Sequence, residues 1–160
     1  STMLATVSAL SAQNIGAKNY GRARTVLKYA VMITTLYGII VTLIVECAAP
    51  TLLGLFTKDT TVILLGVQYI SSYIIDTIFA GIHFGFSGYF AADGKSYIGF
   101  IHNIISISLV RVPGSYIASI MYPHNLFPMG LAAPLGSLLS VIICLIAYCI
   151  LKKKDELSVL

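Results

Sequence analysis

Charge is what this sequence has least of. Only 10% of its 160 residues are charged, against about 25% in a typical soluble domain. Three long stretches are almost free of charge: residues 29–45 carry none, residues 60–92 carry only Asp76, and residues 96–151 carry only Arg111. With a mean hydropathy of +0.91, the chain has too few charged side chains to cover a water-exposed surface, which excludes an ordinary soluble domain.

Enzyme and cofactor motifs are also missing. The sequence contains no P-loop, no GxGxxG turn and no Ser/His/Asp arrangement in a polar loop. One Asp and one in-span histidine, His83, form no nucleophile–base pair, so we expect neither an enzyme nor a cofactor. The net charge of +4 comes from basic residues at helix ends and in loops, which is typical of membrane proteins and not of nucleic-acid-binding proteins.

Cysteine is scarce as well. Cys47, Cys144 and Cys149 lie in apolar stretches with no CxxC or Cys/His spacing. No metal site is therefore expected, and we predict that all three are buried small hydrophobic residues.

Long apolar segments, by contrast, are abundant. Because a bilayer core needs about 20 apolar residues per helix, and because the apolar runs do not alternate as barrel strands do, we predict an all-α, polytopic membrane protein. Four complete spans are expected, at residues 29–55, 61–91, 97–121 and 129–151. Residues 1–12 are too short to span, and the chain does not start with Met, so we expect a fifth, incomplete helix and a longer parent protein.

The basic residues predict the orientation of these spans. Alternate loops on one side hold eight Lys or Arg residues, in the 13–28 segment, the 93–95 loop and the tail, whereas the other side holds only Lys58. Because positive loops stay in the cytoplasm, we predict a multi-pass plasma-membrane protein whose 152–160 tail is cytoplasmic.

A polar stripe runs along the second predicted span. Its members, at helical spacing, are Tyr69, Tyr73, Asp76, Ala80, His83 and Ser87. Asp76 lies near the middle of the membrane, where a carboxylate must be protonated, paired or bound to a cation. We therefore predict Asp76, with Tyr73 and His83, as a site for Na⁺ or H⁺ coupling. The alternatives are a static Asp76 and a His83 that only forms hydrogen bonds.

Arg111 lies at a similar depth in the third span. Pro113, two residues after Arg111, predicts a kink in this helix. Arg111 can pair with Asp76 or neutralise the backbone carbonyls that Pro113 leaves without a donor. Since arginine keeps its proton, we expect Arg111 to act as a structural or gating charge and not as the coupling site. Ser108 and Ser115 are expected on the same face. The Gly81-to-Gly85 GxxxG step is interpreted as helix packing.

Four sequence motifs resemble those of the multidrug and toxic compound extrusion (MATE) transporters. They are SAQNIGAK at 11–18 followed by RAR at 22–24, LFTKD at 55–59, GYFAADGKS at 88–96 and RVPGSY at 111–116. The resemblance implies twelve helices in two lobes of six. Residues 1–151 would then be the end of helix eight and helices nine to twelve of the second lobe, completed by upstream helices of the same protein.

This resemblance also implies a function. Members of the family export cationic, amphipathic drugs in exchange for Na⁺ or H⁺ across the lipid bilayer, as in the bacterial inner membrane, and some use an acidic residue in helix ten, where Asp76 lies. The alternatives are a lipid-linked oligosaccharide flippase of the same superfamily, which would be expected to have more cationic residues in its cavity, and a membrane subunit that does not itself transport.

Overall fold

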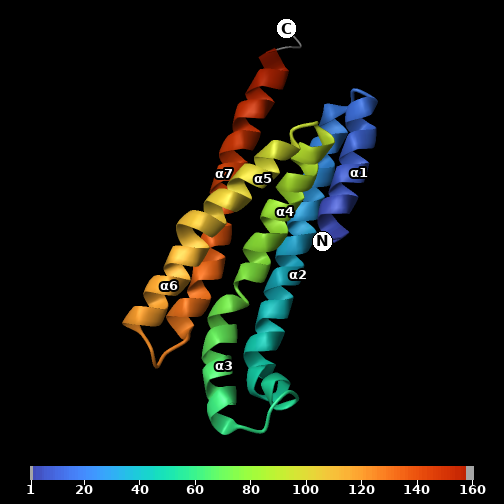
Figure 1. Ribbon diagram of the computed structural model, residues 1–160. Coiled ribbons are helices and arrows are strands. Elements are labelled where there is room, and N and C mark those ends of the chain that lie inside the picture. Colours follow the sequence, from blue (N-terminus) through green and yellow to red (C-terminus); the bar gives the residue numbers. More distant parts are fainter. Residues whose placement is uncertain (1, 158–160) are drawn as a thin grey trace.

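The protein folds into a bundle of long helices, seen in a computed structural model that describes residues 2–157, with side chains described as far as Lys153. No strand occurs among these residues. The elements are α1 (Thr2–Gly16), α2 (Tyr20–Gly54), α3 (Thr60–Tyr73), α4 (Asp76–Ala92), α5 (Ser96–Ser106), the π-helical segment η1 (Ile107–Arg111), α6 (Val112–Met121) and α7 (Phe127–Leu157). Figure 1 shows them as a long bundle, with the C-terminal end of α7 projecting beyond it.

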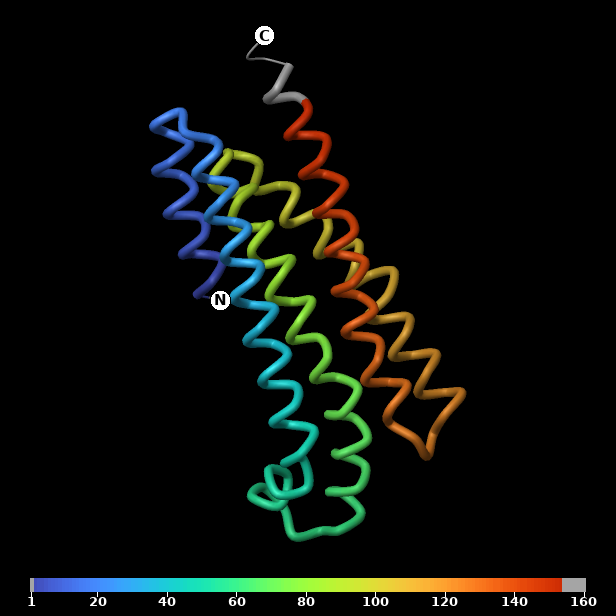
Figure 2. Tube along the Cα trace, turned by 180° about the vertical axis from the view of Figure 1, so that it is seen from behind, coloured from blue at the N-terminus to red at the C-terminus, as the bar shows by residue number. Residues whose placement is uncertain are grey.

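Four of the helical stretches are long and apolar enough to cross a membrane. They are Tyr20–Gly54, Thr60–Ala92, Ser96–Met121 and Phe127–Lys153. The all-α, four-span architecture predicted from the apolar segments is therefore confirmed. Two of these spans are interrupted, since α3 and α4 share one, and α5, η1 and α6 share another. Figure 2, from behind, shows each of these interrupted spans as one continuous rod.

The helix α4 is the centre of the bundle. It packs against α1, α2, α5 and α7, and eight of its 17 residues are buried. Close approach depends on small residues: a Cβ added at Gly81 would lie 2.7 Å from Thr34 Cβ of α2, and one added at Gly88 would lie 2.6 Å from the Leu4 carbonyl oxygen of α1. The GxxxG step thus packs α4 against α2, although Gly85 has ordinary clearance there.

The helix ends differ from those expected. The first span begins at Tyr20 and not at residue 29, because Asn19 caps it: the Asn19 side chain accepts a hydrogen bond from the Arg22 backbone N–H at 3.3 Å. The polar segment 13–28 is therefore mostly helical, and Lys18, at φ 57°, lies in the short connection. At the other end, α7 continues to Leu157, so part of the predicted 152–160 tail is helix. Residues 158–160 lie outside the described range.

The cysteine prediction was wrong for two residues of three. Cys144 is buried in the main apolar cluster with Val7, Leu27 and Phe90, but Cys47 and Cys149 are exposed on the surface of the bundle. A membrane-facing helix buries only one of its sides against protein, so an apolar residue in a span can as readily face lipid.

Candidate functional site

The second span breaks immediately before Asp76. Ile74 and Ile75 form a turn between α3 and α4, and the Ile74 carbonyl oxygen accepts a hydrogen bond from the Thr77 backbone N–H at 3.0 Å, three residues on, in place of the i+4 bond of a regular α-helix. The Thr42 hydroxyl of α2 donates a hydrogen bond to this carbonyl oxygen at 3.4 Å. Non-helical backbone at membrane depth is tolerated where other groups satisfy it. Here Thr42 adds a second hydrogen bond to a carbonyl that already accepts from the Thr77 N–H.

This break places Asp76 in the first turn of α4. The dipole of α4 favours a carboxylate in this first turn. Only 8% of Asp76 is exposed. Its partner is Arg111, whose Nη2 donates to Asp76 Oδ1 at 3.2 Å and to Oδ2 at 3.3 Å. The sequence left three possible states for Asp76: protonated, paired or bound to a cation. In the structure Asp76 is paired, with Arg111.

The side chain of Arg111 is held from the opposite side by α7. Arg111 is the last residue of η1, and its Nη2 also donates to Ser137 Oγ at 2.6 Å. Gly136 of α7 provides the space, since a Cβ there would lie 2.6 Å from Arg111 Cγ. Arg111 Nε is buried and has no hydrogen-bond partner among the described residues, so the guanidinium satisfies only part of its donor capacity.

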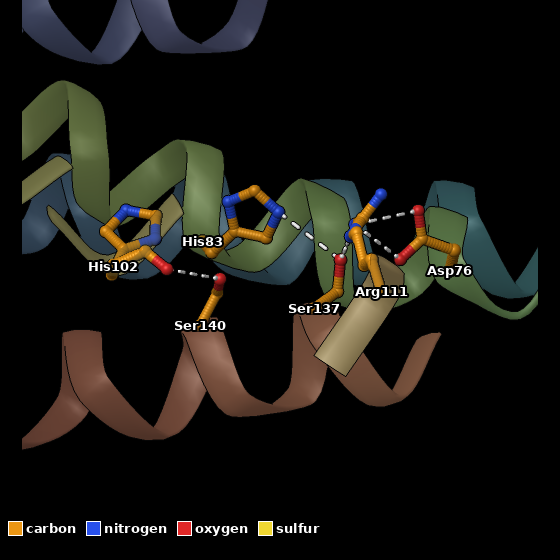
Figure 3. A network of polar contacts seen from close by, with 6 residues as sticks. All are labelled: Asp76, His83, His102, Arg111, Ser137 and Ser140. Atoms are coloured by element: carbon orange, nitrogen blue, oxygen red, sulfur yellow. Dashed lines mark hydrogen bonds and ion pairs between the residues drawn. The ribbon is translucent and has the colours of Figure 1, made fainter. Parts of the chain in front are cut away.

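Beyond Arg111, polar side chains continue along the bundle core. Ser137 Oγ lies 3.5 Å from His83 Nε2, and the rings of His83 and His102 contact edge to face with centroids 5.5 Å apart. His102 Nε2 lies 2.9 Å from Ser87 Oγ. Figure 3 shows the chain from Asp76 through Arg111 and Ser137 to the two histidines. We name these six residues the polar chain: Asp76, Arg111, Ser137, His83, His102 and Ser87.

The hydroxyl protons indicate how the histidines are protonated. Ser87 Oγ donates to the His83 backbone carbonyl at 2.9 Å, and the His102 tautomer that fits this arrangement has its proton on Nε2 and donates to Ser87 Oγ. Ser137 accepts from Arg111, so its own proton is available for His83 Nε2. Nδ1 of both rings is buried without a partner in the described part of the chain. Each ring therefore has a nitrogen whose hydrogen bonding is not committed.

An open pocket adjoins Asp76 on the side of α1 and α2. Its volume is about 440 Å³, and it is lined by Asp76 together with aromatic residues from three helices, namely Tyr37, Tyr73 and Phe84. Thr34 and Thr77 add hydroxyl groups. The pocket thus combines one acidic group with aromatic walls, a combination that suits an organic cation.

The residues predicted from the sequence do not all meet in one place. Asp76, His83 and Ser87 are buried along the polar chain, whereas Tyr73 is 40% exposed and stacks on Tyr69, joining Asp76 only as a wall of the pocket. In the described residues, no three His, Cys, Asp or Glu side chains gather as a metal site.

The third span differs from its prediction because of η1. This π-helical segment ends at Arg111, two residues before Pro113. A π-helix has more residues per turn than an α-helix, so faces counted at α-helical spacing shift across it. Ser108 is exposed, and Ser106 is buried in its place, with its Oγ 2.8 Å from a Cβ added at Gly136.

Several residues of the site were missed from the sequence. His102 was overlooked although, like His83, it is a histidine in an apolar span; only His83 lay on a polar stripe with Asp76. Ser137 and Ser140 were not predicted as site residues, but Ser137 Oγ accepts from Arg111 and Ser140 Oγ donates to the His102 carbonyl at 3.4 Å. Thr42 had no signal at all, because the break to which it adds a hydrogen bond has no proline or glycine to mark it.

Comparison with known proteins yields one match. The family model described as MatE matches residues 1–117, a range that contains α1 to α5, η1 and the first half of α6. All of the polar chain except Ser137 falls within it. No curated protein and no solved structure matches the chain.

Proposed function

The chain belongs to the MatE family of membrane transporters, and from this premise we propose that it forms part of an antiporter that exports amphipathic organic cations in exchange for H⁺ or Na⁺. The observation that supports this most strongly is the pair of a buried Asp76 and a half-buried Arg111 beside an aromatic pocket. One carboxylate there faces two environments: the arginine on one side and the pocket on the other.

Antiport requires that ion and substrate exclude each other. A single carboxylate can supply this exclusion, because a proton, a sodium ion and a substrate cation all compete with Arg111 for the same two oxygens. The ion pair suits such an exchange of partners on Asp76 because its hydrogen bonds are long. One arginine nitrogen spans both oxygens at 3.2 and 3.3 Å, longer than the roughly 2.7–2.9 Å of a strong charge-assisted bond.

Substrate would bind in the pocket beside Asp76. A cation can lie over the faces of Tyr37, Tyr73 or Phe84, which attract positive charge through the ring quadrupole, while its apolar part contacts the walls. A bound cation near Asp76 weakens the hold of the carboxylate on Arg111. The substrate would thereby favour one conformation over the other, and only to the extent that it binds the two differently.

The histidines would carry protons to or from this pair. His83 and His102 lie in series behind Ser137, and each has an uncommitted ring nitrogen. An imidazole can take up a proton and release it again, whereas Arg111 keeps its proton. In this proposal Arg111 is the structural or gating charge, and Tyr73 a wall of the cation site.

The protein would function in the plasma membrane together with the remaining helices of a twelve-helix transporter. The orientation follows from the basic residues: the end of the bundle with Arg22, Arg24, Lys28 and Lys152 would be cytoplasmic. The apolar faces of α2 and α6, exposed in this bundle, would contact lipid or those other helices.

The test is Asp76→Asn in the full-length protein, reconstituted in proteoliposomes. Efflux of a fluorescent organic cation is measured under an imposed pH or Na⁺ gradient. We expect gradient-driven efflux to be lost. Asp59→Asn is the matched control: it makes the same chemical change in a loop, where asparagine caps a helix as well as aspartate does. An Asp76→Asn protein with unchanged ion dependence would show that Asp76 is structural.

A further inference from the structure

A second pocket lies at the opposite end of α4 from Asp76, between α2, α4 and α7. Its volume is about 480 Å³. Because α4 packs against both α2 and α7, Phe86 of α4 forms its floor while α2 and α7 form its sides. It shares no lining residue with the polar chain or with the pocket beside Asp76.

The rim of this pocket is basic. Arg24 and Lys28 come from the first turns of α2, and Lys152 comes from the last turns of α7. Lys152 is more than 120 residues away in sequence from the other two cations, so only the fold brings it to the same opening. Thr25 adds a hydroxyl, and among the side chains that the structure describes, as far as Lys153, none that lines the pocket is acidic. This rim suits an anion with several acceptor oxygens.

The deeper part of the pocket is apolar. Leu27, Val31 and Leu145 line it with Phe86. Leu145 lies seven residues before Lys152, or about 10 Å along α7 at 1.5 Å per residue. The Tyr148 ring closes the side between them, contacting Phe86 and Tyr89 edge to face with centroids 5.7 Å away in both cases. A small anion such as free phosphate would occupy only the rim.

We propose that this pocket binds an anionic phospholipid, with its phosphate headgroup between Lys28, Arg24 and Lys152 and its first acyl carbons against Val31 and Leu145. Apolar side chains exposed on α2 and α7 next to it, Met32 and Ile146 among them, continue the path toward the bilayer core. Basic pockets between membrane helices recognise anionic lipid headgroups in this way. The lipid would join α2 to α7 across α4.

The proposal is tested on the purified full-length protein in detergent by native mass spectrometry, titrating phosphatidylglycerol against phosphatidylcholine. We expect preferential binding of phosphatidylglycerol. The variant Lys28→Gln/Lys152→Gln should weaken that binding by about fivefold per lysine, or roughly twenty- to thirtyfold in total. The control Lys18→Gln/Lys153→Gln removes the same charge at the same end of the bundle from residues outside the pocket, and should bind as wild type does.

Three results would overturn the proposal. They are equal binding of the two lipids, equal loss in both double variants, and displacement of phosphatidylglycerol by equimolar glycerol phosphate, which would make the headgroup alone the ligand. A measurement on the unmodified protein covers the case of a variant that does not fold. A photoactivatable phosphatidylglycerol should label peptides containing Val31 and Leu145, and labelling confined to α3 and α6 would refute the site.

Discussion

Gly136 of α7 and Arg111 of η1 fit together so closely that a Cβ at position 136 would lie 2.6 Å from Arg111 Cγ and 3.1 Å from its Nε. The guanidinium reaches Asp76 because α7 has no side chain at that point. A small residue in one span thus determines where the cation of another span lies, and through it the state of the buried carboxylate.

Gly136→Ala should therefore displace Arg111 and impair transport. We expect a loss of stability of about 1–3 kcal/mol from overpacking and a larger fractional loss of efflux, because the arginine no longer meets Asp76. Efflux in proteoliposomes and thermal unfolding in detergent measure the two effects. The control is Gly54→Ala, where an added Cβ meets nothing within 4 Å; equal behaviour of the two variants would refute the fit.

The Asp76–Arg111 pair predicts a marked non-additivity. Arg111→Gln alone leaves a buried carboxylate without its partner, which typically costs about 3–5 kcal/mol. Adding Asp76→Asn removes that charge, so the double variant Asp76→Asn/Arg111→Gln should be more stable than Arg111→Gln alone. Thermal unfolding of the four proteins of the cycle measures the coupling. If the two single effects simply add, the ion pair contributes nothing.

His83 distinguishes a proton relay from a structural hydrogen bond. His83→Asn keeps a side chain that can bond to Ser137 but cannot titrate. If His83 relays protons, efflux driven by a pH gradient should fall at least tenfold while binding of the organic cation stays within twofold of wild type. Binding is measured by fluorescence titration of the purified protein. Full proton-driven efflux in His83→Asn would leave His83 a structural role only.

The two glycines of the GxxxG step should differ in sensitivity. Gly81→Ala puts a methyl group 2.7 Å from Thr34 Cβ, whereas Gly85→Ala places its nearest contact, Val31, at an ordinary 3.6 Å. We expect Gly81→Ala to lower the melting temperature by several degrees and Gly85→Ala to leave it nearly unchanged. Gly85→Leu, which is much larger, should disrupt the α2–α4 contact. Equal tolerance of alanine at both positions would contradict this packing.

The proposed orientation is open to cysteine labelling. In a background with Cys47, Cys144 and Cys149 replaced by Ala, a membrane-impermeant maleimide added to intact cells should label Lys58→Cys and Asn125→Cys. It should not label Lys18→Cys or Lys154→Cys until the cells are permeabilised. The physical reason is the eight-to-one excess of basic residues on one side. The reverse pattern would invert the topology.

The sequence by itself determined the membrane class and the number of spans. Its charge-free stretches are long enough to cross a bilayer and too apolar for water, and this follows from composition without any contact between helices. The same argument identified Asp76 and Arg111, because a lone charge inside an apolar run is conspicuous in one dimension. The motifs that resemble MATE transporters also needed no structure.

Only the tertiary structure decided how those residues are used. Asp76 and Arg111 are 35 residues apart, and their pairing depends on Gly136 and Ser137 of another helix, α7. The break at Ile74 and Ile75 has no proline or glycine to signal it, and the hydrogen bond that Thr42 adds there comes from a neighbouring helix. The segment η1 moves Ser108 outward and Ser106 inward. Each of these outcomes depends on what a neighbouring helix offers, and hydrophobic periodicity records only which side of a helix is apolar.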